Sequence, residues 1–208
     1  MKKKLKWGVL STAKIAREKV IPAMANSDLY EVYGIASRNL ERAQETAKSL
    51  GIPKAYGSYE DLINDPEIDV IYNPLPNDMH VPLTLKCIEA GKHVLCEKPF
   101  ALNHEEIDGL IAARDKYNVK VGEAFMVASN PQWIKARELV KSGYLGKIKA
   151  VQGFFSYFND DIKNIRNIEE MGGGGVWDIG CYPVFTSRFV LEKEPGRLVS
   201  MLEYDPQF

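Results

Sequence analysis

The sequence lacks the features that mark three large classes of protein. Its 208 residues include only three cysteines, which are far apart and form no C-x-x-C pair, so neither a disulfide framework nor a cysteine metal site is expected. Apolar runs are short, and only Trp7–Leu10 follows the basic start, too little for a signal peptide or a membrane span. Lys and Arg number 27 against 28 Asp and Glu, and this balance argues against a nucleic-acid or membrane-surface partner.

What the sequence contains is the composition of a globular protein with one or two cores. Hydrophobic residues make up 45% of the chain. Cys96 lies in the apolar run His93–Cys96 and is expected to be a small core residue. Unpaired cysteines and the absence of a targeting pattern predict a soluble protein in a reducing, cytoplasmic setting.

Short strand-like runs alternate with helical patterns as far as about residue 125. This alternation predicts a parallel sheet with helices on both faces, whose ligands bind beyond the carboxyl ends of the strands. Glycine after a helix favours its termination, as at Gly51 and Gly91. The expected strands are Lys6–Leu10, Tyr30–Ala36, Val70–Asn73, His93–Cys96 and Val119–Ala124, and the expected helices are Ile15–Ala25, Leu40–Leu50, Pro82–Ala90 and His104–Tyr117.

Beyond residue 125 the pattern changes. Helices are expected at Pro131–Lys141 and at about Val176–Leu191, and strands at Lys147–Phe158 and Leu198–Tyr204. So few strands and helices make a poor independent core. We therefore expect the chain to be a fragment whose second sheet leaves an apolar face uncovered, Phe154 and Tyr157 included, and which alone is aggregation-prone or dependent on a partner.

Two motifs bear on chemistry. Glu97-Lys98-Pro99 follows an apolar strand, and the run Gly172–Gly175 precedes Asp178 and Tyr182, which lie four residues apart and thus on one face of a helix. Lysine, aspartate and tyrosine together can move protons for a hydroxyl or carbonyl substrate. Alone, the first motif is an ordinary surface turn and the second a flexible loop, but their joint presence favours catalysis.

With these motifs in this order, the chain resembles the Gfo/Idh/MocA oxidoreductases, most closely their dihydrodiol and NADP-dependent D-xylose dehydrogenase branch. The resemblance implies a Rossmann-type doubly wound parallel sheet in residues 1–125. Residues 126–208 would begin an α+β domain for substrate and dimerisation, with an open, mainly antiparallel sheet. It also implies a cis Lys98–Pro99 peptide, a homodimer when full length, and a chain covering the N-terminal two-thirds of such an enzyme.

The first turn of the sheet is the candidate phosphate site. A dinucleotide fingerprint would have glycine at Ser11, Ala13 and Ala16; small residues keep much of the steric freedom, and hydroxyls can donate to phosphate. The alternative is an ordinary strand-to-helix turn, although the branch shares this S-T-A variant. The residues assigned to the cofactor in this turn are Ser11, Thr12, Ala13, Lys14 and Ile15.

The end of the second expected strand indicates which dinucleotide binds. An acid there would accept from the ribose hydroxyls of NAD, whereas Ser37 and Arg38, with Arg42 one turn on, offer donors and positive charge that match a 2′-phosphate. The alternative is that both arginines are solvated residues of a helix start. We predict NADP in preference to NAD.

The third cofactor segment is the run from Asn73 to His80, directly after an expected strand. Its prolines fix an extended path, and Asn77 is placed to cap the next helix. The resemblance implies that this loop, with Pro74, Leu75, Asn77 and His80, contacts the nicotinamide ribose. Without it, His80 would be a surface residue at a helix start.

The resemblance also implies the catalytic roles. Tyr182 would be the acid/base, Lys98 would lower the pKa of this phenol, and Asp178 would orient the substrate. Glu97, Lys98, Arg166 and Trp177 would also contact the cofactor, although a charged surface loop explains Asn164–Asn167 equally well. Relatives carry arginine at Ala128 and histidine at Asn130, so this chain departs from them beside the site.

These features predict an NADP-dependent enzyme that moves a hydride between nicotinamide and a hydroxyl-bearing carbon of a sugar or cyclic diol, without a metal. Ala128 and Asn130 keep open a non-catalytic dinucleotide-binding sensor or regulatory subunit. A third reading is an enzyme that holds NADP tightly and passes hydride between two sugars.

Overall fold

The computed structural model describes residues 4–203. By its internal contacts the chain divides into two compact units, residues 1–124 (unit 1) and 125–208 (unit 2).

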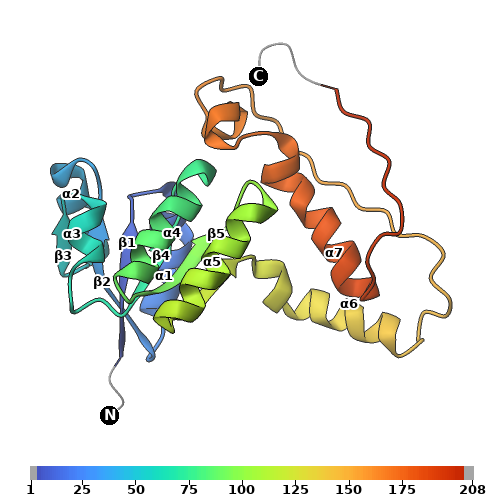
Figure 1. Cartoon of the computed structure of the whole chain (residues 1–208), viewed down its shortest axis with the longest axis horizontal. Coiled ribbons are helices and arrows are strands. Elements are labelled where there is room, and N and C mark those ends of the chain that lie inside the picture. The colour runs from blue at the N-terminus through green and yellow to red at the C-terminus, as the bar shows by residue number, and fades with distance from the viewer. Residues whose placement is uncertain (1–3, 204–208) are drawn as a thin grey trace. The chain divides into compact units, whose positions relative to one another are not determined.

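Unit 1 is built on one six-stranded sheet in which all paired strands run parallel, in the order β3-β2-β1-β4-β5-β6. The chain therefore winds outward twice from the middle, and the strand order reverses between β1 and β4, as in dinucleotide-binding folds. This confirms the predicted doubly wound sheet (Figure 1). The strands are β1 Leu5–Leu10, β2 Tyr30–Ala36, β3 Lys54–Tyr56, β4 Val70–Asn73, β5 His93–Glu97 and β6 Val121–Ala124.

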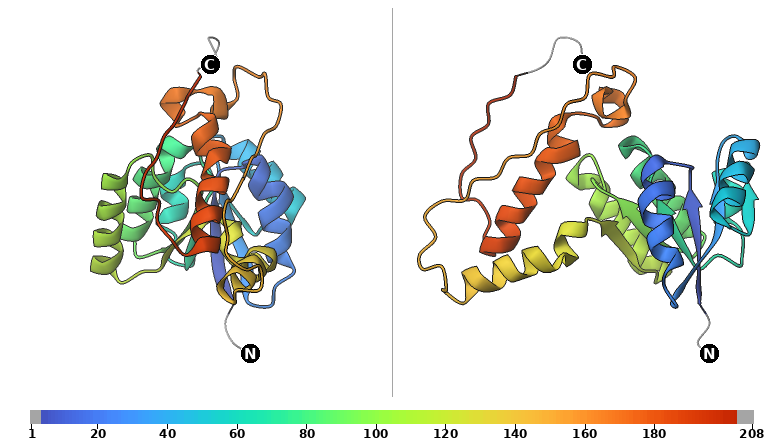
Figure 2. Two further views of the ribbon diagram at one scale, coloured as in Figure 1. Left: turned by 90° about the vertical axis from the view of Figure 1, so that its right-hand side faces the viewer. Right: turned by 180° about the vertical axis from the view of Figure 1, so that it is seen from behind.

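Helices cover both faces of this sheet (Figures 1 and 2). One apolar cluster joins Ile71 and Val94 of the strands to α3, α4 and α5, and a second joins Val9, Ile35 and Tyr72 to Ile21 of α1 and Ala47 of α2. The helices are α1 Ile21–Ala25, which continues the π-helical turn η1 Ala16–Val20, then α2 Leu40–Leu50, α3 Tyr59–Ile63, α4 His80–Glu89 and α5 His104–Tyr117.

Local sequence explains where several helices begin and end. The side chains of Asn39, Ser58 and Asn103 accept hydrogen bonds from the backbone amides three residues on and so cap α2, α3 and α5. Gly51 and Gly91 end α2 and α4 with φ of 67° and 74°, as predicted. Neither β3 nor α3 was predicted, because elements of three and five residues are too short to show a period.

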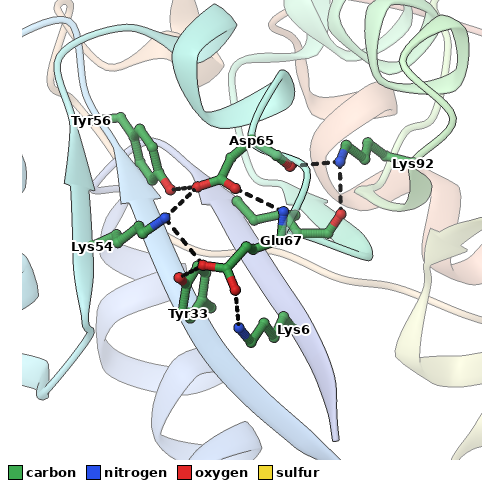
Figure 3. A network of polar contacts seen from close by, with 8 residues as sticks. Lys6, Tyr33, Lys54, Tyr56, Asp65, Glu67 and Lys92 are labelled. Carbon is green, nitrogen blue, oxygen red and sulfur yellow. Dashed lines mark hydrogen bonds and ion pairs between the residues drawn. The ribbon is translucent and has the colours of Figure 1, made fainter. Parts of the chain in front are cut away.

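A polar network joins the first three strands to the loop before β4 (Figure 3). Lys54 donates to Asp65 over 2.8 Å, and the Tyr33 hydroxyl donates to Glu67. Lys92 is 8% exposed, and its Nζ donates to the carbonyl oxygens of Asp65 (2.7 Å) and Ile68 (2.8 Å). The network fixes the loop that leads into the central strand β4.

Unit 2 contains two main helices, α6 Pro131–Lys141 and α7 Cys181–Leu191, which pack against each other (Figure 2). Both were predicted, α7 as part of a longer helix whose first turn is π-helical (η6, Val176–Gly180). The described part of unit 2, residues 125–203, also contains the 3₁₀ turns η3 Met126–Ser129, η4 Ile165–Asn167 and η5 Glu169–Met171.

The predicted strands of unit 2 are not present in residues 125–203. Residues 147–158 and 198–203 form no ladder, because no described segment of unit 2 pairs with them; Tyr204, the predicted end of the second strand, lies outside the described residues. The side chains of this run nevertheless point in alternate directions. Phe155 and Tyr157 contact residues at the start of α7 and in η6, whereas Phe154 and Phe158 are 95% and 86% exposed.

Candidate active site

In unit 1, the turns with the predicted cofactor residues all follow the carboxyl ends of strands. They come after β1 (residues 11–15), β2 (37–42), β4 (74–80) and β5 (97–99). Because the strands are parallel, these four turns lie at one edge of the sheet, on both sides of the place where the strand order reverses. That edge is where such folds bind ligands.

The turn after β1 is held by its own hydroxyl and by a neighbouring arginine. Ser11 has a φ of 84°, a left-handed conformation that glycine adopts without strain, and its Oγ accepts from the Ala13 amide over 3.2 Å. Arg17 Nε donates to the Thr12 carbonyl over 2.9 Å. Thr12 is buried, whereas Lys14 and Ile15 are exposed. The serine therefore takes the backbone conformation that the fingerprint assigns to glycine.

The end of β2 presents positive charge to solvent. Ser37 is buried, and its Oγ accepts from the Asn39 amide over 3.2 Å. Arg38 and Arg42 are exposed. Burial raises the pKa of Tyr59 above its ordinary value, and the nearby Arg38 guanidinium opposes that rise. Between Ser37 and Leu40 there is no acid that could accept from ribose hydroxyls, so the side chains present suit a phosphate.

In the loop after β4, the structure corrects two predictions. His80 is 1% exposed, and both ring nitrogens face backbone carbonyls, so neither is available to a cofactor. Asn77 does not precede a helix as its cap: it begins the 3₁₀ turn η2 (Asn77–Met79), with Pro76 before it. Pro74 and Leu75 are buried, and Asn77 is half-buried.

The turn after β5 is anchored on both sides of Lys98. Tyr72 donates to the Glu97 carboxylate over 2.5 Å, and the Phe100 amide donates to the Glu123 carboxylate over 2.9 Å. Burial and then the Glu97 charge raise the pKa of Tyr72, which keeps this phenol protonated as a donor. The Lys98–Pro99 peptide is cis, as predicted, and Lys98 is half-buried.

In unit 2, Asp178 is the centre of a polar cluster. Its carboxylate accepts from Tyr157 Oη over 2.5 Å and from Arg166 Nε over 3.2 Å, and its side chain is 15% exposed. Burial and the bond to Asp178 raise the pKa of Tyr157. The cluster therefore combines a carboxylate, a guanidinium and a protonated phenol.

The glycine run folds back onto the Asn164–Asn167 element and so builds this cluster. Gly173 N donates to Ile168 O (2.9 Å) and Gly174 N to Arg166 O (2.8 Å). A Cβ on Gly173 would lie 2.6 Å from Ile168 O, so this position requires glycine. The sequence showed the two segments separately, while the structure joins them as one loop that places Arg166 beside Asp178.

Tyr182 lies in the first turn of α7, among aromatic rings of the same unit. Its ring centroid is 4.9 Å from that of Phe125 and 5.4 Å from that of Phe155. Trp177, assigned to the cofactor, is 38% exposed in η6. Asn130 caps α6 by accepting from the Gln132 amide over 2.9 Å, and Ala128 is exposed.

The predicted catalytic residues are divided between the two units: Lys98 belongs to unit 1, and Asp178 and Tyr182 belong to unit 2. Sequence reasoning missed the polar contacts of Tyr157, Arg17 and Tyr72. Tyr157 was visible only as one member of an apolar run, and the other two only as residues of a strand or helix. Their polar partners are distant in sequence or lie in the backbone, so no motif marks them.

Within residues 4–203, no helix is long and apolar enough to cross a membrane. Among these same residues, no group of three or more His, Cys, Asp or Glu side chains is arranged to hold a metal ion.

Comparison with known families gives two matches that together span most of the chain. Residues 5–125 match the family described as "Oxidoreductase family, NAD-binding Rossmann fold", and residues 133–207 match the "GFO/IDH/MocA C-terminal domain". The first match alone covers more than half of the chain.

Two curated relatives come from the branch that the motifs indicated. Trans-1,2-dihydrobenzene-1,2-diol dehydrogenase of Xenopus tropicalis is 40% identical over 86% of this chain and 54% of its own length. D-xylose 1-dehydrogenase (NADP(+)) 2 of Haloferax volcanii is 40% identical over 89% of this chain and 57% of its own length. The chain thus spans little more than half of these relatives.

A solved structure is similar along nearly the whole chain. The 3-ketoreductase KijD10 from Actinomadura kijaniata, in complex with NADP and TDP-benzene, matches with a TM-score of 0.86 and 30% identity. The match covers 91% of this chain and 58% of that one.

Proposed function

This chain belongs to the Gfo/Idh/MocA oxidoreductase family, and we propose that it binds NADP and acts in hydride transfer to or from a hydroxyl-bearing carbon of a sugar or cyclic diol. The observation that supports this most is the Glu97–Phe100 turn, which anchors Lys98 at the carboxyl edge of a doubly wound sheet. Relatives named as acting on a dihydrodiol and on D-xylose support the substrate class.

Residues of unit 1 would hold the cofactor. The turn from Ser11 to Ile15 would receive the pyrophosphate, and the exposed Arg38 and Arg42 would pair with a 2′-phosphate. The segment from Ser37 to Leu40 contains no acid that could accept from the ribose hydroxyls of NAD. The two arginines therefore fit NADP better than NAD. Pro74 and Leu75 would support the nicotinamide end through the backbone of their loop, with Asn77 and Glu97 beside it.

The proton chemistry would use residues of both units. NADP supplies the hydride acceptor or donor when bound. Tyr182 takes or returns the proton of the substrate hydroxyl, and Lys98, as a cation, favours the phenolate form of that tyrosine. Asp178 orients the substrate, and Arg166 and Tyr157 fix its carboxylate. Arg166 and Trp177 would also contact the cofactor.

The two units would divide the work as a dinucleotide-binding domain, residues 1–125, and the start of a substrate and dimerisation domain, residues 126–208. Dimerisation and a cytoplasmic setting belong to the same proposal. Cys87 and Cys96, both buried thiols, agree with a reducing environment.

The activity is tested by assaying the protein with NADP against a panel of aldoses and cyclic dihydrodiols. We expect NADPH formation with at least one of them, followed at its absorbance. If no substrate reduces NADP although NADPH binds, the catalytic part of the proposal is wrong.

Such an outcome would favour a second function, a non-catalytic NADP-binding sensor. The observation behind it is that Asn130, where relatives carry histidine, uses its side-chain oxygen to cap α6, and that Ala128 offers no polar group. NADPH binding without turnover, together with a specific protein partner, would establish this function.

A further inference from the structure

His80 joins two loops that the sequence presents as separate motifs. Its Nδ1 lies 2.7 Å from the carbonyl oxygen of Pro99, and its Nε2 lies 2.8 Å from the carbonyl oxygen of Leu75. Pro99 belongs to the turn that contains Lys98, and Leu75 to the loop after β4. At 1% exposure, the ring has no access to solvent that could replace these bonds.

Both ends of this bridge are fixed by further hydrogen bonds. Asn73, fully buried at the end of β4, accepts from the Leu75 amide over 3.3 Å and donates to the His80 carbonyl over 3.2 Å. On the other side, the Phe100 amide donates to Glu123. Leu75 is thus held at both its amide and its carbonyl, and the turn is held one residue to either side of its cis peptide.

Ring chemistry makes the bridge specific to histidine. Carbonyl oxygens only accept, so each contact is a hydrogen bond only where the facing ring nitrogen carries a proton: a neutral ring bonds one of the two carbonyls and contacts the other, and the doubly protonated ring bonds both. No other side chain directs two nitrogens to opposite sides of one small ring.

We propose that His80 is a positioning residue that touches neither cofactor nor substrate. Its ring fixes the position of the Lys98 turn relative to the loop after β4. This inference rests on the proposed function for Lys98 and replaces the cofactor contact predicted for His80. A shift of one loop would move the other, so the two would present one surface to the nicotinamide end of the cofactor.

The two contacts of the bridge, the Nδ1–Pro99 contact (the Pro99 arm) and the Nε2–Leu75 contact (the Leu75 arm), can be removed separately by substitution. The amide nitrogen of asparagine lies near the position of Nδ1, and that of glutamine near Nε2, so His80→Asn retains the Pro99 arm and His80→Gln the Leu75 arm. His80→Leu removes both. Cys87→Ala, a change at another fully buried position of α4, controls for general loosening of that helix.

The first readout is hydrogen exchange at the Leu75 and Phe100 amides without cofactor. We expect at least tenfold faster exchange at Leu75 alone in His80→Asn, at Phe100 alone in His80→Gln, and at both in His80→Leu. Cys87→Ala should change the exchange rates of these two amides no more than it changes the rates of the amides of α4. Unchanged rates in His80→Leu, or both amides affected alike in every variant, would overturn the bridge.

The second readout is steady-state kinetics. His80→Gln frees the Lys98 turn and should lower kcat at least tenfold with KM for NADP within threefold. His80→Asn should raise that KM with kcat within threefold. Equal effects on both constants in both variants would assign His80 a merely structural role. If the wild-type protein has no activity, the proposed function fails, while the exchange experiment still decides whether the bridge exists.

Discussion

In unit 1 large apolar side chains in the middle of the sheet are buried, whereas in unit 2 several of similar size face solvent. Leu10, Ile35 and Ile71 are 0% exposed, while Phe154 and Met201 are 95% and 94% exposed. Both regions contain apolar runs that the sequence analysis assigned to strands. The difference is that every strand of unit 1 has a neighbour on the sheet, whereas residues 147–158 and 198–203 pair with no strand within the described residues 4–203.

A run of apolar residues therefore stabilises a segment only where a neighbouring strand or helix can cover its side chains. In unit 2 such surfaces are supplied by α6 against α7, by the aromatic rings around Tyr182, and by the hydrogen bonds between the glycine run and Asn164–Asn167. The proposed chemistry draws on such locally ordered parts of both units.

The largest expected effect is on the proposed chemistry. Lys98→Met should lower kcat roughly 10²–10⁴-fold, the usual range for losing a group that assists proton transfer, and leave NADPH affinity within about threefold. Lys86→Met is the matched control, since Lys86 is an exposed lysine of the same unit, paired with Glu60. A Lys98 variant as active as the control would exclude the assigned role.

One substitution in each unit, at a buried position of unit 1 and an exposed position of unit 2, tests the contrast in burial. Ile71→Ala should lower the free energy of unfolding by about 2–5 kcal/mol, because it leaves a cavity in the middle of the sheet. Phe158 is 86% exposed, so Phe158→Ala should change the free energy of unfolding by no more than about 0.5 kcal/mol. Denaturant unfolding measures both. Comparable losses would show that the segment around Phe158 is packed in solution.

Local order in unit 2 is tested at the glycine run. Gly173→Ala would force a Cβ against Ile168 O, displace the loop and move Asp178, which should cost activity on the order of 10²-fold. Gly175→Ala meets nothing within 4 Å and should keep activity within about twofold. If the two variants behaved alike, the fold of this loop would not matter for the reaction.

The smallest expected effect is a pH dependence confined to unit 1. Burial alone would raise the pKa of Asp65, but hydrogen bonds from Lys54 and Tyr56 lower it to about 2. The unfolded value is about 3.9, so this carboxylate stabilises the fold above that pH and loses its contribution as the pH falls from about 4 to about 2. The stability difference between wild type and Asp65→Asn should shrink across that window. A constant difference would rule out the pairing.

Most of unit 1 could be predicted from the sequence because its helices, strands and turns are determined by residues close to one another in the chain. The alternation of strands and helices, Gly51 at a helix end and the E-K-P turn all depend on neighbouring residues. The bridge through His80 could not be predicted, because its two partners are backbone carbonyls 5 and 19 residues away, with no signature in side-chain identity.

Unit 2 shows where pattern reasoning fails. The helix at Pro131–Lys141 was predicted to the residue. The predicted strand at 147–158 was wrong, because a strand needs a paired neighbour as well as a run of apolar residues. The joining of Gly173 and Gly174 to the Asn164–Asn167 element depends on backbone hydrogen bonds, so Tyr157 and Arg166 could not be placed beside Asp178 in advance.

The central claim, that unit 1 is an NADP-selective dinucleotide site, is tested most directly by calorimetric titration of the protein with NADPH and with NADH. The account predicts saturable binding of NADPH, binding of NADH weaker by roughly tenfold or more, and loss of most of this preference in Arg38→Ala, since a charge-assisted hydrogen bond is worth about 1.5–3 kcal/mol. Equal or tighter binding of NADH, or no saturable binding of NADPH, would contradict it.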